Sequence, residues 1–351
     1  MANSNPPRNT QTPAEPQVLD SLHRPMRDLR ISVTDHCNFR CVYCMPKAVF
    51  GTRYHFVGHD GLLQFDEIER LARQFARLGV RKIRLTGGEP LLRPHLEDLV
   101  ESLSAIPGIE DLALTTNAST LTPKKAEALR KAGLQRINIS LDALDEDVFQ
   151  KMNDVGFPVA RVLQAIDDAA AAGLNVKINM VVRRGLNDSQ IVPMAEHFRG
   201  TDHVLRYIEY MDVGNLNGWQ LQEVVPAQEI LARITELWPL QPVEAHRYGE
   251  VATRHRYIDG QGEIGVISSI SQPFCGSCTR ARLSPEGQLF TCLFGTKGHD
   301  LRALLRDGAA DEEIYARLQS IWQARDDRYS ELRATSAMTD VKKVEMFHIG
   351  G

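Results

Sequence analysis

Residues 29–44 read Leu-Arg-Ile-Ser-Val-Thr-Asp-His-Cys-Asn-Phe-Arg-Cys-Val-Tyr-Cys, so that a strand-like run leads directly into three closely spaced cysteines. The cysteines Cys37, Cys41 and Cys44 have the spacing C-x3-C-x2-C. Three thiolates can bind three corners of a cubane iron–sulfur cluster and leave the fourth iron without a protein ligand. A closed zinc site would need a fourth ligand. The stretch therefore predicts a strand that carries an open-iron cluster at its carboxyl end.

A second group of cysteines repeats this pattern near the other end of the chain. The six cysteines fall into two triads, because Cys275, Cys278 and Cys292 form the second and none lies elsewhere. Disulfides are the alternative. Residues 1–17 lack the apolar segment of a secretory signal, so we expect a cytoplasmic, reducing environment. In that environment close cysteine pairs indicate metal or cluster ligands.

The composition limits the possible partners. With 351 residues the chain is long enough for a barrel and an additional module. The formal net charge of −4 argues against nucleic acid as a partner. No apolar run reaches the roughly 18 residues that span a bilayer, so we expect no membrane partner either. We interpret residues 1–18 as a disordered extension.

Strand-like and helix-like segments alternate from Asp28 onward. Each of Gly79, Gly133 and Gly173 ends a helix-like segment and is followed at once by a strand. Repeated strand–helix units predict parallel strands with right-handed crossovers. Six units favour an incomplete (β/α)6 TIM-like barrel, with a doubly wound open sheet as the alternative. The predicted strands are Leu29–Thr34, Lys82–Thr86, Asp111–Thr115, Arg136–Leu141, Val176–Val182 and Val204–Tyr210, and the predicted helices are Phe65–Leu78, His95–Leu103, Pro123–Lys131, Val159–Ala172 and Asp188–Phe198.

These strands are unusual for a parallel sheet because polar and apolar residues alternate along them. Lys82 and Arg84, for example, flank Ile83, and Lys177 lies between Val176 and Ile178. If the apolar face lies under the helices, the lumen of the barrel is polar and cationic. Unpaired buried cations are costly, so such a lumen should hold an anionic ligand. The alternatives are half-solvated antiparallel strands, or internal salt bridges with Glu89 and Glu209.

The regular alternation of strand-like and helix-like segments ends after Tyr210, and we place a domain boundary near residue 220. Residues 19–220 form the predicted barrel and residues 221–351 a C-terminal α+β region with the second triad. There we predict helices over Pro226–Leu237, His299–Asp307 and Asp311–Ala324, short strands within Val243–Ser269, and a hairpin at Ser284–Gly287.

The first triad, with Tyr43 before its last cysteine and Gly87-Gly88-Glu89-Pro90 after the second strand, resembles the radical S-adenosylmethionine (SAM) superfamily. The resemblance implies a [4Fe–4S] cluster whose open iron binds the methionyl group of SAM. One electron from the cluster cleaves SAM to methionine and a 5′-deoxyadenosyl radical in that family.

A longer likeness narrows the family. The stretches Arg27–Asp35, Ile83–Pro90, Met211–Gly214, Cys275–Leu283 and the terminal Gly350-Gly351 resemble the GTP 3′,8-cyclases, also called molybdenum cofactor biosynthesis protein A. This implies a second three-cysteine [4Fe–4S] cluster that binds guanine, and cyclisation of GTP as the first step of molybdenum cofactor biosynthesis. It also implies a homodimer, and a downstream pyranopterin monophosphate synthase that receives the product.

The same resemblance assigns the site residues. The first cluster would be bound by Cys37, Cys41 and Cys44, and the second by Cys275, Cys278 and Cys292. SAM would be bound by Tyr43, Gly88, Ser140 and Met211. GTP would be bound by Arg30, Arg84, Thr115, Lys177, Arg280 and Arg282, of which Arg280 and Arg282 would also be catalytic. Arg206 is the next cation of the predicted lumen. The tail that ends in Gly350-Gly351 would reach the active site. Two positions depart from the family: His36 replaces a common arginine, and Ala118 a frequent glycine.

Three alternatives stay open from the residues. Arg280 and Arg282 could be an exposed basic pair rather than phosphate ligands, although the chain has no G-x4-G-K-[ST] loop to hold a triphosphate. The chain could be a radical enzyme with an auxiliary cluster that acts on a peptide. It could also be a zinc or redox-sensing protein without catalysis.

Overall fold

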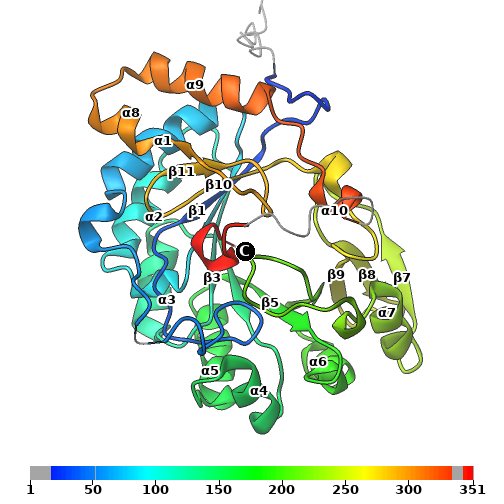
Figure 1. The fold of residues 1–351 in the computed structure, drawn as a ribbon. Helices are drawn as coiled ribbons and strands as arrows, with labels where there is room; N and C mark the ends of the chain where they lie inside the picture. The colour runs from blue at the N-terminus through cyan, green and yellow to red at the C-terminus, as the bar shows by residue number, and fades with distance from the viewer. Residues whose placement is uncertain (1–16, 52, 334–342, 351) are drawn as a thin grey trace, which may run out of the picture.

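The computed structural model describes residues 17–51, 53–333 and 343–350. Its strands are β1 (Asp28–Ser32), β2 (Lys82–Thr86), β3 (Asp111–Thr116), β4 (Arg136–Ser140), β5 (Asn175–Val182), β6 (Val204–Glu209), β7 (Leu240–Val243), β8 (Thr253–Tyr257), β9 (Glu263–Ile267), β10 (Arg280–Leu283), β11 (Gln288–Phe290) and β12 (His299–Asp300). They form one curved 12-stranded sheet in the order β12-β11-β10-β1-β2-β3-β4-β5-β6-β9-β8-β7 (Figure 1).

The sequential order of β1 to β6 decides between the two predicted architectures. These strands are parallel neighbours in chain order, whereas a doubly wound sheet reverses its order at an internal switch point. The incomplete barrel is therefore confirmed. Two further parallel strands extend it, because β10 pairs with β1 and β9 pairs with β6. The sequence predicted strands in both regions but not that they join the barrel.

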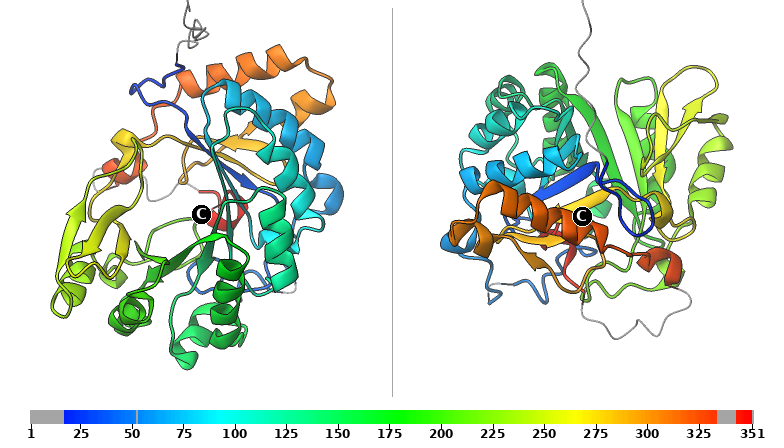
Figure 2. Two further views of the ribbon diagram at one scale, coloured as in Figure 1. Left: turned by 180° about the vertical axis from the view of Figure 1, so that it is seen from behind. Right: turned by 90° about the horizontal axis from the view of Figure 1, so that it is seen from above.

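Most of the helices cover the outer side of the curved sheet, whereas the last one lies beside the lumen cavity, which its Ser330 lines (Figures 1 and 2). The helices are α1 (Phe65–Arg77), α2 (Leu96–Ser104), α3 (Pro123–Lys131), α4 (Glu146–Asn153), α5 (Val159–Ala171), α6 (Ile191–Phe198), α7 (Ala227–Thr235), α8 (Arg302–Arg306), α9 (Asp311–Gln323) and α10 (Tyr329–Leu332). Helix α4 was not predicted. The helix predicted from His299 is wrong at its start, since β12 precedes α8. No helix in the described part of the chain is long and apolar enough to cross a membrane.

The glycine that ends α1 shows how each helix turns back into the sheet. Gly79 has φ 111° and its N–H donates to the Ala76 carbonyl oxygen, while the N–H of Val80 donates to the Phe75 carbonyl oxygen at 3.0 Å. This bonding defines a Schellman motif, which needs a left-handed residue. Gly133 and Gly173 repeat it after α3 and α5. The three predicted helix ends are confirmed.

The alternation along the strands places their apolar side chains under the helices. Ile31, Ile83 and Ile178 are each fully buried in the main hydrophobic cluster. The polar residues between them face the inside of the curve, where Figure 1 also shows the short 3-10 helix η7 (Met346–His348) near the chain's end. The strands are parallel, so the half-solvated antiparallel alternative is wrong.

Candidate active site

Three arginines from three adjacent strands meet in the lumen. In the strand register Arg30 of β1 lies beside Arg84 of β2 on one side and Arg282 of β10 on the other. Together with Arg206 of β6 they line one cavity, whose volume is about 110 Å³. Neighbouring strands are about 4.8 Å apart, so the geometry of the sheet brings these like charges together.

Carboxylates do not neutralise these cations. Within the described residues no Asp or Glu oxygen lies within 4.0 Å of the charged nitrogens of Arg30, Arg84, Arg206, Arg282 or Lys177. The acids proposed as internal partners are engaged elsewhere. Glu89 accepts from Thr116 Oγ1 at 2.6 Å and from the Asn117 N–H at 2.7 Å, and Glu209 accepts from the N–H groups of Ala227, Ile270 and Ser271. The internal salt-bridge alternative is therefore wrong.

The cost of this arrangement is visible in the acid–base properties of the lumen. Burial, followed by repulsion from Arg136, lowers the pKa of Arg84 to about 10. Burial and the neighbouring Arg206 lower the pKa of Lys177 to about 8. The Nε atoms of Arg84 and Arg206 are buried without a hydrogen-bond partner in the described part of the chain. An anionic ligand would supply both the missing charge and the missing acceptors.

Cations nearer the amino ends of the strands are, by contrast, neutralised. Lys82 Nζ lies 3.5 Å from Asp28 and 3.7 Å from Asp111, and Arg136 donates to both oxygens of Asp111 at 2.9 Å. Uncompensated charge thus lies in the middle of the strands, although Lys177 also lines the cavity that holds Lys82 and Arg136. In TIM-like barrels chemistry occurs toward the carboxyl ends of the strands.

The first cysteine triad lies in the loop after β1, as predicted. Cys37, Cys41 and Cys44 are free thiols and half-buried, and Cys37 Sγ accepts from the Phe39 N–H at 3.4 Å. Burial raises the pKa of Cys37 to about 12, with Glu89 adding to the shift. Metal binding would remove this cost, because a coordinated thiol gives up its proton.

The fit to a cluster rests on how these thiols are arranged. In the described residues no three Cys, His, Asp or Glu side chains surround a point as ligands of one metal ion. The thiolates on a cubane bind different irons and therefore need wider separation than those on one zinc ion. Apolar side chains surround the thiols, since Cys41 and Cys44 pack against Tyr43, Met152 and Tyr210. Three half-buried free thiols on one loop, with apolar neighbours, are a donor set that fits a cluster.

The residues predicted to contact SAM lie, like the first triad, at or after the carboxyl ends of the strands. The Tyr43 hydroxyl donates to Asp142 at 3.0 Å, and the Gly88 N–H donates to the Thr34 carbonyl oxygen at 2.8 Å. A Cβ on Gly88 would collide with the His36 carbonyl group, so only glycine fits there. Ser140 ends β4, and Met211 lines the cavity that holds the arginines.

Three polar groups beside the triad were not assigned roles from the sequence. Glu89 and Asp142 are buried carboxyls, and burial raises the pKa of each to about 7. The Asn117 amide donates to Cys37 Sγ at 3.8 Å. All three lie within three residues of a strand's end, in loops where barrel enzymes carry reactive groups, and this rule selects the loops but gives no role to the individual side chains.

The departure at Ala118 has a structural reason. Ala118 has φ 60°, a left-handed conformation that glycine adopts most easily. Its methyl group packs in the main hydrophobic cluster, and its N–H donates to Thr116 Oγ1 at 2.9 Å. These contacts offset the backbone strain and keep the loop after β3 in place.

The second triad lines the same cavity as the arginines. Cys275 and Cys278 bracket the 3-10 turn η5 (Cys275–Ser277), and Cys292 follows β11. Cys278 Sγ accepts from Arg280 Nε at 3.3 Å and from Nη2 at 3.2 Å. Burial alone would raise the pKa of Cys278, but Arg280 and Arg325 outweigh it and lower the pKa to about 6. The donor set again fits a group that binds thiolates.

The alternative of an exposed basic pair is wrong, because Arg282 is 2% exposed and Arg280 is half-buried over the Phe274 ring. Thr115 lies on the lumen face of β3, where its Oγ1 accepts from the Asn138 amide at 3.3 Å. Lys177 lines an adjoining cavity that shares Arg30, Arg84, Arg206 and Arg280 with the first. The structure therefore brings all of the predicted GTP-binding side chains to one lumen.

The end of the chain also enters this lumen. Arg30 Nη1 donates to the Gly350 carbonyl oxygen at 3.3 Å, and Arg282 donates to the same oxygen. Phe347 packs edge-on against Phe50, at 5.0 Å between ring centroids, beside the first triad. Gly351 lies outside the described residues.

The fold and the first triad together define a radical SAM protein, and comparison with known proteins agrees. Residues 31–198 match the Radical SAM superfamily, and residues 203–331 match the family described as Molybdenum Cofactor Synthesis C. The structure of SuiB from Streptococcus suis, solved with bound S-adenosylmethionine, superposes with a TM-score of 0.60 over 90% of this chain and 72% of that chain, at 15% identity. That likeness concerns the fold alone.

Full-length relatives identify the family. A GTP 3′,8-cyclase of Acidothermus cellulolyticus is 50% identical over 359 residues, which cover 95% of this chain and 99% of that protein. A GTP 3′,8-cyclase of Staphylococcus saprophyticus is 48% identical with the same coverage. The chain belongs to the GTP 3′,8-cyclase family of the radical SAM superfamily.

Proposed function

We propose that this enzyme cyclises GTP to (8S)-3′,8-cyclo-7,8-dihydroguanosine 5′-triphosphate in a SAM-dependent radical reaction, the first step of molybdenum cofactor biosynthesis. The observation that carries the proposal is the lumen row Arg282–Arg30–Arg84, which has no carboxylate partner among the described residues and opens onto the second triad. A substrate that satisfies this row must be strongly anionic, and the triphosphate of GTP, the substrate named for the family, meets that requirement.

Cys37, Cys41 and Cys44 would hold the first [4Fe–4S] cluster, which when bound supplies one electron for cleavage of SAM. The residues around it orient the cosubstrate. Gly88 lets SAM approach the backbone, and Tyr43 is kept in place by its hydrogen bond to Asp142. The apolar side chains of Met152 and Tyr210, which pack against Cys41 and Cys44, would keep water away from the carbon radical.

Arg30, Arg84, Lys177 and Arg282 would bind the phosphates, and Thr115 with Arg206 would fix the nucleotide along the lumen. A carbon radical reacts with whatever lies nearest, so holding C3′ of the ribose at the first triad and C8 of guanine within reach of it is the main task of these side chains. We propose a second [4Fe–4S] cluster on Cys275, Cys278 and Cys292 that binds the base, with Arg280 and Arg282 as the catalytic residues that touch the substrate.

The test is anaerobic incubation with GTP, SAM and a reductant. We expect equimolar 5′-deoxyadenosine and a cyclised nucleotide with the mass of GTP. ATP and a peptide serve as competing substrates. Release of 5′-deoxyadenosine with the peptide alone, and none with GTP, would favour the peptide-modifying alternative.

Four further points belong to this proposal, of which the first two rest on the family likeness. The product passes to a pyranopterin monophosphate synthase, and the enzyme acts as a homodimer. The six free thiols suit a reducing cytoplasm. The barrel extends over residues 19–220 and the auxiliary-cluster region over 221–351. Size-exclusion chromatography with light scattering tests the dimer.

A further inference from the structure

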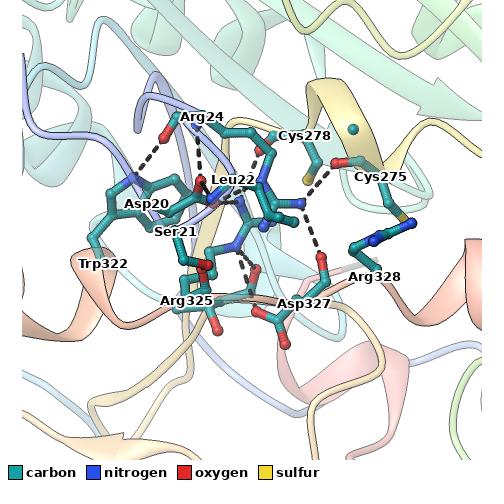
Figure 3. A network of polar contacts seen from close by, with 12 residues as sticks. Asp20, Ser21, Leu22, Arg24, Cys275, Cys278, Trp322, Arg325, Asp327 and Arg328 are labelled. Carbon is teal, nitrogen blue, oxygen red and sulfur yellow. Dashed lines mark hydrogen bonds and ion pairs between the residues drawn. The ribbon is translucent and has the colours of Figure 1, made fainter.

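A buried bridge of two arginines and one aspartate lies directly behind the second triad (Figure 3). Asp20 Oδ2 accepts from Arg24 Nε at 2.6 Å and from Arg325 Nη1 at 2.8 Å. The side chains of all three residues are at most 1% exposed. Trp322 completes the packing, with its indole N–H donating to the Arg24 carbonyl oxygen at 3.0 Å.

Three further hydrogen bonds from this bridge reach the backbone of the triad, while Arg24 Nη1 also donates to the Asp327 carbonyl oxygen and Arg24 Nη2 has no partner among the described residues. Arg24 Nη1 donates to the Cys275 carbonyl oxygen at 2.7 Å, and Arg325 Nη1 donates to the Cys278 carbonyl oxygen at 2.9 Å. Arg325 Nε donates to the carbonyl oxygen of Thr291, the residue before Cys292, at 3.1 Å. All three cysteine positions are therefore held by one unit.

Local structure alone would not fix these positions. Cys275 and Cys278 lie at the ends of a three-residue 3-10 turn, and Cys292 lies after a three-residue strand. Short turns of this kind allow several side-chain placements. The N–H groups of a planar guanidinium have fixed directions, and two guanidinium groups joined by one carboxylate form a rigid frame.

We infer that Arg24 and Arg325, joined by Asp20, are positioning residues that set the second cysteine triad for its cluster. The inference rests on the proposed second cluster. Groups that orient metal ligands from behind change metal affinity by about 10- to 100-fold when they are removed. The bridge joins the N-terminal arm, α9 and the triad, so it couples three distant segments to one site.

The experiment uses the full chain with one triad at a time. Replacing Cys37, Cys41 and Cys44 with alanine leaves the second triad, which after anaerobic reconstitution should hold about four irons per chain. Into this background we place Arg325→Lys, which keeps the charge but loses the fork of donors. The readout is the rate of iron release to a chelator, followed by the loss of visible absorbance.

The matched control is Arg93→Lys. Arg93 is also buried, at 7% exposed, and also binds two carbonyl groups, those of Val33 at 3.1 Å and Leu63 at 2.8 Å, but it lies away from the second triad. We expect Arg325→Lys to speed iron release by about 10- to 100-fold while Arg93→Lys leaves it unchanged. In the reverse background, which lacks the second triad, Arg325→Lys should not affect iron release.

Release from Arg325→Lys at the parent rate would overturn the inference and leave the proposed cluster intact. If the parent with only the second triad holds no iron, the proposed cluster itself is wrong, and the inference falls with it before any arginine is changed. Should Arg325→Lys fail to fold by circular dichroism, Asp20→Asn tests the same bridge, because it keeps both arginines and the shape of the linking side chain.

Discussion

At the scale of single residues, the lumen stabilises a ligand at the expense of the free protein. Arg84 shows this most clearly, because its Nε is buried without a partner in the described part of the chain. We expect Arg84→Met to weaken GTP binding by about 10- to 100-fold, as a charged hydrogen bond contributes about 1.5–3 kcal/mol. The same change should raise the unfolding free energy of the GTP-free protein by about 1 kcal/mol, since it removes an unsatisfied buried donor.

Anaerobic calorimetry and urea unfolding measure the two effects, and the iron content should stay unchanged. Arg136→Met is the matched control, because Arg136 is paired with both oxygens of Asp111. Its removal strands a half-buried carboxylate and should destabilise the protein. Loss of stability in both variants would show that Arg84 has a stabilising partner in the GTP-free protein.

Lys177 gives the lumen a pH dependence. Its pKa is lowered from 10.5 to about 8 in the folded protein. Between these values the unfolded chain holds more protons than the folded one, so this residue makes stability rise with pH. GTP affinity should change in the opposite direction, falling above pH 8 as the ammonium group loses its charge.

Urea unfolding and GTP titration between pH 7.5 and 10, compared with Lys177→Met, isolate this contribution, because Lys82 titrates over a similar range. In the variant, both the unfolding free energy and the GTP affinity should depend less strongly on pH. Equal slopes in the two proteins would show that Lys177 does not carry the effect.

At the scale of elements, the tail is the segment with the clearest consequence. Gly350 has φ 70°, and a Cβ there would collide with Thr86, while its carbonyl oxygen accepts from Arg30 and Arg282. We expect deletion of Gly350 and Gly351 to abolish cyclisation and to leave SAM binding and iron content unchanged. Product analysis and equilibrium dialysis with SAM measure the two effects.

Gly350→Ala should reproduce most of the loss, since alanine is strained at this φ and has no room. Gly308→Ala is the control: Gly308 has φ 80° but nothing within 4 Å of an added Cβ. Full turnover by the truncated protein would refute a role for the tail.

The sequence predicted elements well where their signal is local. The glycines after the helices predicted where the strands β1 to β6 begin, and the period of two along Lys82–Thr86 predicted which side chains face the lumen. The joining of β10 to β1 was not predictable, because a four-residue strand, Arg280–Leu283, pairs with a segment about 250 positions away. The Asp20–Arg24–Arg325 bridge escaped for the same reason, as ion pairs across 305 positions leave no periodic trace.

At the scale of the whole molecule, two triads at opposite ends of one lumen predict the iron content. Anaerobic reconstitution should give about eight irons per chain, and alanine at all three cysteines of either triad should leave about four. The loaded protein should also resist urea better than the metal-free protein, because the clusters bind only the folded chain.

Iron analysis and the visible absorbance of iron–sulfur charge transfer provide the measurement. Stoichiometric zinc and a colourless protein would instead support the zinc-binding alternative. If the wild-type protein holds only four irons and Cys44→Ala loses all of them, the first triad binds a cluster and the second does not.

The long-range bridge has a consequence for how the molecule is made. The first triad and β1 to β6 are complete by Glu209, whereas the frame behind the second triad joins Asp20 to Arg325. Contacts between distant positions form late, and the chain leaves the ribosome from its amino end. The part of the barrel that carries the first triad should therefore be assembled while the region with the second triad is still being synthesised. Nascent chains arrested once β6 has left the ribosome should take up iron at the first triad alone. The oxygen-labile first cluster would then form before the region with the second triad is present.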